Sequence, residues 1–217
     1  MSSLPCSQAP PAAEGFLDFY GGWALAGKTD AVHQRLVPPP PPGTVTKHLN
    51  FDASGTFGVR GGYWFEPFPW LGFAVDLSFF QRKAEAAHID LVPLSLLLML
   101  RYPLLTSEQF PKGQLQPYVG IGPSVFSSHT SIDFGPPFGG VNHGNVFGDG
   151  GVDVRAGLTW QAHKSFGLFW EYRFTHVNLD YQLETCPGLF TCTGPTTTHS
   201  TTDLNLDTHH FLVGIRF

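Results

Sequence analysis

The sequence has little charge, and no strong excess of one sign. Only 13% of its 217 residues are Asp, Glu, Lys or Arg, which is about half the usual share for a soluble globular domain. The formal net charge is −5, and the twelve Lys and Arg residues are scattered. Nucleic-acid binding is not expected, because it needs a basic patch. Disorder is not expected either, because disordered chains are poor in aromatic residues, which here make up 14%.

Long apolar runs are also missing. A transmembrane helix needs about 18 or more consecutive apolar residues, whereas the longest apolar stretch, 91–100, is interrupted by Pro93 and Ser95. The first residues have neither the basic start nor the apolar segment of a signal peptide. We therefore expect either a cytosolic chain or a mature sequence from which the leader has been removed.

Cysteine is scarce, with three in the chain. Cys186 and Cys192 flank a short segment rich in Thr, Gly and Pro, and this spacing favours a loop disulfide in an oxidising compartment. Two unrelated thiols are the alternative. A zinc site is disfavoured because no second cysteine pair follows. The cysteines thus favour the mature, exported chain over the cytosolic one.

The sequence does contain a repeated alternation of apolar and polar residues, which predicts β-strands with one apolar face. Segment 168–174 puts Leu, Trp, Tyr and Phe on one face and Glu and Arg on the other, and 71–79, 152–161 and 211–217 repeat the pattern. Residues 1–14 are predicted to be a flexible tail, and 15–217 a single barrel domain. The eight predicted strands are 15–26, 51–65, 70–83, 88–102, 115–127, 150–162, 166–179 and 206–217.

The connections between these strands alternate in length, except for the short one at 84–87. The turns at 66–69 and 162–165 are tight and the connection at 103–114 is moderate, whereas long loops are predicted at 27–50, 128–149 and 180–205. Strands that cross a bilayer need about 9–11 residues, which each predicted strand exceeds. Short periplasmic turns and long extracellular loops are typical of outer-membrane barrels. We therefore predict an all-β, eight-stranded, antiparallel up-and-down transmembrane barrel.

The charges on the polar face are nearly all Arg, Asp and Glu, mixed with glycine. Arginine binds carboxylates through several parallel hydrogen bonds, which lysine cannot match, and side chains fill the interior of an eight-stranded barrel. The charged residues are therefore predicted to form an ion network inside the lumen: Asp18, Arg60, Asp76, Arg101, Asp153, Arg155, Glu171, Arg173 and Arg216.

The opposite face carries no charge and is predicted to face lipid, with aromatic residues, Phe126 among them, in girdles near the strand ends. A soluble sandwich or lipocalin-like barrel with an aromatic core is the alternative. Pro93, Pro117 and Pro123 lie inside predicted strands. Because proline removes a hydrogen bond from the ladder, β-bulges are expected to accommodate them.

Four segments, 61–65, 115–122, 170–174 and 210–217, resemble the outer-membrane β-barrel superfamily, porin-like and of the OmpA/OmpX type. The resemblance implies insertion into a bacterial outer membrane, contact with its lipid and lipopolysaccharide, and surface loops. The last segment looks like the signal that the barrel-assembly machinery reads, carried by Phe211, Val213, Ile215 and Phe217. Such a resemblance implies no reaction, because small barrels serve many functions.

We therefore expect a structural or surface-interaction protein with a filled lumen, no cofactor, no metal and no catalytic residue, whose three long loops could bind a surface ligand. One alternative is a narrow diffusion pore. Another is a lipid A deacylase of the PagL type, which has a His-x-Ser-Asn stretch on a late strand. His176 resembles that histidine, but Asn178 stands where serine is needed and cannot accept the acyl group. The ten histidines show no metal-binding spacing.

Overall fold

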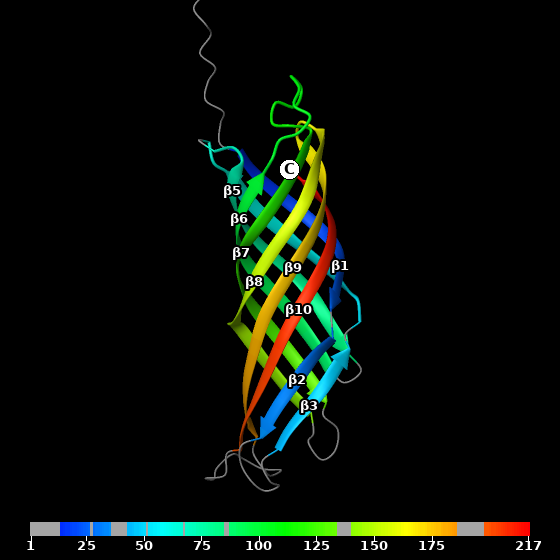
Figure 1. The fold of residues 1–217 in the computed structure, drawn as a ribbon, viewed down its shortest axis with the longest axis vertical. Coiled ribbons are helices and arrows are strands. Elements are labelled where there is room, and N and C mark those ends of the chain that lie inside the picture. Colours follow the sequence, from blue (N-terminus) through cyan, green and yellow to red (C-terminus); the bar gives the residue numbers. More distant parts are fainter. Residues whose placement is uncertain are drawn as a thin grey trace, which may run out of the picture.

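The computed structural model describes residues 14–26, 28–35, 43–50, 52–66, 68–84, 87–133, 140–185 and 198–217. Within these residues, ten antiparallel strands form one sheet, and pairing of the first strand with the last closes it into a barrel. Figure 1 shows the strands strongly tilted around the long axis of the molecule. Among the described residues, no helix is long and apolar enough to cross a membrane.

The wall of the barrel has eight strand positions, although the described residues form ten strands. The short strands β2 and β3 continue the course of β1 and β4. Both β1 and β2 pair with β10, and β2 and β3 form a hairpin at the end of the barrel opposite the C-terminus (Figure 1). The predicted eight-stranded antiparallel barrel is therefore confirmed. The strands are β1 Glu14–Ala26, β2 Lys28–Arg35, β3 Gly43–Asn50, β4 Ser54–Trp64, β5 Leu71–Ala84, β6 Ala87–Arg101, β7 Leu115–Asp133, β8 Gly140–His163, β9 Phe166–Thr185 and β10 Thr198–Arg216.

The predicted long loops were wrong in extent. Most of 27–50 belongs to β2 and β3, most of 128–149 to β7 and β8, and much of 180–205 to β9 and β10. The reason is that backbone pairing continues beyond the point where one face stops being apolar. We call the end of the barrel that carries these three segments the loop end. The other end, with the connections 65–70, 102–114 and 164–165, is the turn end.

Strands β8 and β9 stop pairing with each other near the loop end. Pairing between β8 and β9 stops at Gly151 and Val177, and beyond it, within the described residues, β8 pairs with β7 and β9 with β10. A register shift opposite Ser127 adds extra residues to β8 there, and Phe147 takes a positive φ of 50°. The left-handed conformation is unfavourable for a bulky residue, so this irregularity interrupts β8, which has a second register shift between Trp160 and His163.

Two of the three prolines lie where the ladder is interrupted. The pairing of β5 with β6 skips from Leu77–Leu94 to Phe80–Leu91, which leaves Pro93 in the gap, and that of β6 with β7 skips Pro123 in the same way. Pro117 lies at the end of the β6–β7 ladder, where its carbonyl accepts the amide hydrogen of Tyr102. The prolines are thus accommodated by gaps and by a strand end rather than by the bulges we predicted.

The outer surface is apolar over the turn half of the barrel. Trp170 and Ile215, which would point toward the axis in a soluble barrel, face outward and are 51% and 42% exposed. The lipocalin-like alternative with an aromatic core is therefore wrong. The lumen at the turn end instead holds a separate cluster of aromatic and aliphatic side chains: Phe16, Tyr20, Trp64, Ala74, Leu97, Met99, Tyr118, Phe169 and Leu212.

Candidate functional site

All nine residues predicted for the lumen point inward and are buried. One group surrounds Asp18 on β1, next to the strand pair that closes the barrel. The guanidinium of Arg216 binds both oxygens of the Asp18 carboxylate at 2.7 and 2.8 Å, and Arg60 binds it at 2.7 Å. Arg60 also donates to Glu171 on the far wall. These contacts join β1, β4, β9 and β10 across the interior.

A second group surrounds Arg155 on β8. Its guanidinium binds Asp153 at 2.7 Å and Asp76 at 2.8 Å, and reaches Glu171 at 3.3 Å. Arg173 binds Asp153 at 2.8 Å. Because Glu171 contacts both Arg60 and Arg155, the two groups form one network, which we call the lumen network.

The lumen network is electrically balanced, with four carboxylates (Asp18, Asp76, Asp153 and Glu171) and four guanidinium groups (Arg60, Arg155, Arg173 and Arg216). Balance matters because an unpaired buried charge is costly, whereas a charge paired with its opposite is tolerated. This part of the lumen is therefore filled by salt bridges rather than lined by charges of one sign.

Arg101 was predicted with this group but lies apart from it, at the turn end. It binds Glu14 at 2.6 Å, donates to the carbonyl of Pro69 at 2.8 Å and stacks on Trp64 at 4.3 Å. Glu14 was missed because the sequence interpretation placed it in the flexible tail. The structure instead makes it the first residue of β1.

Hydroxyl groups complete the lumen network and were also missed. Tyr20 donates to Asp76 at 2.8 Å, Tyr118 to Glu171 at 2.7 Å and Ser95 to Asp153 at 2.8 Å. Uncharged residues give no sign in the sequence that they belong to a charged cluster. In the sequence, the only indication would have been that these three residues lie on the inward face of their strands.

Inward glycines make room for the rings of this interior. A Cβ added at Gly58 would lie 2.4 Å from the Tyr20 hydroxyl, and one at Gly157 would lie 2.5 Å from the Tyr118 ring. A Cβ added at Gly214 would lie 2.6 Å from the Phe169 ring. The glycines on the polar face thus let large rings lie flat against the neighbouring strand, which keeps the tyrosine hydroxyls near the carboxylates.

The interior and the outer face both change in character toward the loop end. Here the interior is mixed: buried polar side chains such as Arg82, Ser128 and Asp149 lie among buried apolar ones, namely Phe80, Ile89, Leu91, Phe126, Val177 and Leu206. The outer face at the same height carries polar residues, among them Gln81, Asp90, His129, Asn178 and Asn205. Phe126 was predicted in an outer aromatic girdle, and this was wrong, because its ring is fully buried inside. The apolar exterior thus ends partway along the strands.

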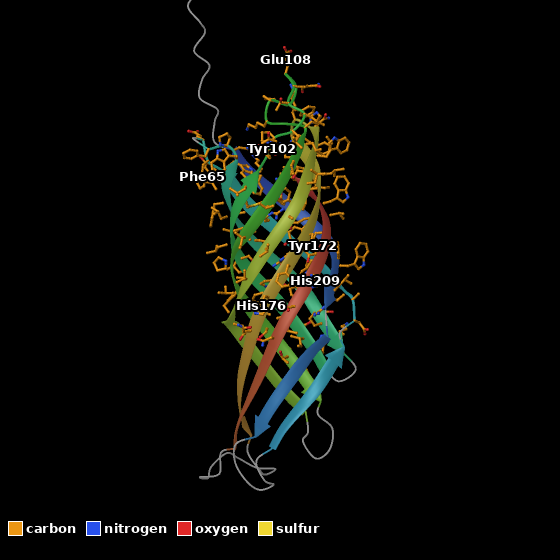
Figure 2. All side chains as sticks on the ribbon, viewed as in Figure 1. Phe65, Tyr102, Glu108, Tyr172, His176 and His209 are labelled. Carbon is orange, nitrogen blue, oxygen red and sulfur yellow. The ribbon has the colours of Figure 1, made fainter. Side chains whose placement is uncertain are left out.

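Two polar pairs on the outer face of β9 and β10 mark this boundary (Figure 2). His176 Nδ1 lies 2.6 Å from Asp207 Oδ1, and the Tyr172 hydroxyl lies 2.7 Å from His209 Nδ1. The register sets Asp207 directly opposite His176, 31 residues away in sequence, so the sequence interpretation missed this carboxylate. Within the described residues, no three His, Cys, Asp or Glu side chains are placed to hold a metal ion.

Two predicted sites remain, the assembly signal and the disulfide, and the structure describes only the first. Phe211, Val213, Ile215 and Phe217 all lie on the outer face of β10 or directly after it. The disulfide predicted between Cys186 and Cys192 lies outside the described residues.

Neither a comparison with protein families nor one with curated proteins finds a match to this chain. Solved structures do match. Neisserial surface protein A has a TM-score of 0.53 at 15% identity, over 94% of this chain and 97% of that one. The outer membrane protein OprG of Pseudomonas aeruginosa has a TM-score of 0.54 at 12% identity, over 94% and 96% of the two chains. The fold is therefore that of the small outer-membrane barrels.

Proposed function

We propose that this protein is a closed outer-membrane barrel with a structural and surface-interaction role, and that it does not conduct solutes through its lumen. The lumen network carries this proposal. Its eight charged groups are buried and paired across the interior, so an ion entering the lumen would have to break salt bridges that have no solvent to replace them.

The location follows from the exterior. The apolar surface of the turn half would be unstable in water but is suited to hydrocarbon, where a closed sheet leaves no backbone group unpaired. Outer-membrane lipid and lipopolysaccharide are thus the expected surroundings, with the turns on the periplasmic side. The outward row Phe211, Val213, Ile215 and Phe217 is the part of the chain that we expect the barrel-assembly machinery to bind. A surface ligand would bind at the loop end.

Single-channel recording in planar bilayers tests the closed lumen. The wild-type barrel is expected to show no conductance steps. The double variant Arg60→Ala/Glu171→Ala removes one charge of each sign, so the lumen stays balanced while it loses volume-filling side chains, and it should conduct. The matched control is Lys164→Ala/Glu108→Ala, whose residues lie outside the lumen. Steady conductance in the wild type would establish the narrow-pore alternative instead.

Membrane location has its own test. With a leader sequence attached, the protein should fractionate with the outer membrane and run faster on gels before heating than after, as folded barrels do in detergent. Recovery as a monomer from plain buffer without detergent would contradict the proposal.

One observation favours a second candidate, a lipid-modifying enzyme. A carboxylate that orients a histidine is part of the arrangement used to activate a nucleophile, and Asp207 contacts His176 at the edge of the apolar belt. Mass analysis of lipid A from cells that make the wild type or His176→Ala distinguishes the two functions. An acyl chain lost in the wild type only would establish the enzyme.

A further inference from the structure

A cavity of about 620 Å³ lies at the turn end of the barrel, and neither the lumen network nor the outer belt uses it. Its walls come from the start of β1, the β4–β5 turn and the β6–β7 connection. Trp64, Trp70 and Tyr102 supply aromatic surface, and three prolines of the two connections supply more apolar surface. Figure 2 shows Phe65 and Tyr102 at this end of the molecule. A mainly apolar, aromatic hollow of this size is suited to a ligand.

Three of the four charged residues that line the cavity bind one another, and the fourth, Glu66, is exposed. Glu14 binds Arg101 at 2.6 Å and Lys112 at 3.2 Å, and the Arg101 guanidinium stacks on Trp64. An occupant that carries charge would have to break these pairs, whereas an uncharged occupant would only cover apolar rings. The chemistry therefore favours an apolar, uncharged chain.

The sequence contains such a chain next to the cavity. Glu14 is both a cavity wall and the residue to which 1–13 is attached. Segment 1–13 has no Asp, Glu, Lys, Arg or His, and contains Pro5, Pro10 and Pro11. We propose that the Pro10–Pro11 stretch binds in the turn-end cavity and covers its aromatic walls.

Three physical arguments support this occupant. Proline-rich segments bind aromatic-lined grooves in the polyproline II conformation, where little chain entropy is left to lose. Pro10 and Pro11 are at most four residues from Glu14, so an extended chain places them within about 12 Å of it. The covalent attachment makes the binding intramolecular, which raises the effective concentration of the segment to the millimolar range or above.

Fluorine NMR of the refolded protein in nanodiscs, with 5-fluorotryptophan at all five tryptophans, tests the proposal. The Trp64 and Trp70 signals are assigned through Trp64→Phe and Trp70→Phe. Deletion of residues 2–11 should shift these two signals and leave those of Trp23 and Trp170, on the outer surface, unmoved. Addition of a peptide with the sequence of residues 2–13 to the shortened chain should restore both signals.

The full-length double variant Pro10→Gly/Pro11→Gly separates binding by the prolines from mere chain length. It should shift the Trp64 and Trp70 signals in the same direction as the deletion. Signals that do not change on deletion, or that follow the lipid headgroup used in the nanodisc instead of the segment, would overturn the proposal. The conductance measurement tests the closed lumen, and the NMR measurement tests binding in the turn-end cavity. Either proposal can therefore fail without the other.

Discussion

The ring of Tyr118 lies so close to Gly157 on the neighbouring strand that a Cβ at Gly157 would lie 2.5 Å from it. The same ring carries the hydroxyl that binds Glu171 at 2.7 Å, and it lies under the guanidiniums of Arg60 and Arg216 at 5.6 and 5.2 Å. The absence of a side chain at one position therefore fixes an aromatic ring at the centre of the lumen network.

Gly157→Val is expected to displace the Tyr118 ring and to lower the free energy of unfolding by about 1–3 kcal/mol, the usual cost of overpacking. Urea titration in detergent, followed by tryptophan fluorescence, measures it. Gly61→Val is the matched control, because nothing lies within 4 Å of a Cβ at that outward position. Equal losses for the two variants would contradict the close packing.

Arg173→Ala is expected to destabilise the barrel by about 3–5 kcal/mol, because it leaves buried carboxylates without their counter-charge. Arg173 is buried and binds Asp153 and the Ser78 hydroxyl, whereas Lys164 is exposed in the β8–β9 turn. Lys164→Ala should thus leave the unfolding midpoint in detergent unchanged. Identical midpoints for the two variants would mean that the inward salt bridges do not stabilise the fold.

Val213→Arg is expected to cost about 2–4 kcal/mol in lipid, because a charge on the outer face at the middle of the belt loses its hydration. Asn205→Arg, on the same strand and the same face but within the polar zone, should cost little. Folding yield and urea midpoint in lipid vesicles measure both. A similar penalty at Asn205 would show that the apolar belt extends farther toward the loop end than the polar residues of the outer face indicate.

Phe80→Ala is expected to cost about 3–5 kcal/mol, because it opens a cavity among the buried side chains of the loop half. Phe80 is fully buried and its ring packs against His210 at 4.8 Å between centroids. Phe57→Ala removes the same number of atoms from the outer face and should cost much less. The comparison is made by unfolding in detergent, and a larger loss at Phe57 would argue against a packed core in this half.

Residues with strict alternation were interpreted well from sequence. In β5, β9 and β10, each side chain near the turn end lies on the face that period two predicts, because a strand turns its side chains to opposite faces in a fixed order. The interpretation failed in the loop half, where apolar side chains also point inward. Phe126 is apolar like its outward neighbours, and only its position in β7 places it inside.

Contacts between distant strands could not be predicted. Asp207 lies beside His176 because of the register in which β9 pairs with β10, and Gly157 lies beside Tyr118 because of the register of β7 with β8 at that point. Shifting either register by one residue would turn every side chain of a strand to the other face. Period two limits the possible registers but does not choose among them.

The sequence by itself determined that the chain is a barrel with charged groups of both signs on one face, because alternation and the choice of arginine over lysine are local properties. Tertiary structure alone decided which guanidinium binds which carboxylate, where the apolar belt ends, and that Glu14 leaves the tail to bind Arg101. These depend on closure of the sheet, which brings residues as far apart in sequence as Asp18 and Arg216 within hydrogen-bonding distance.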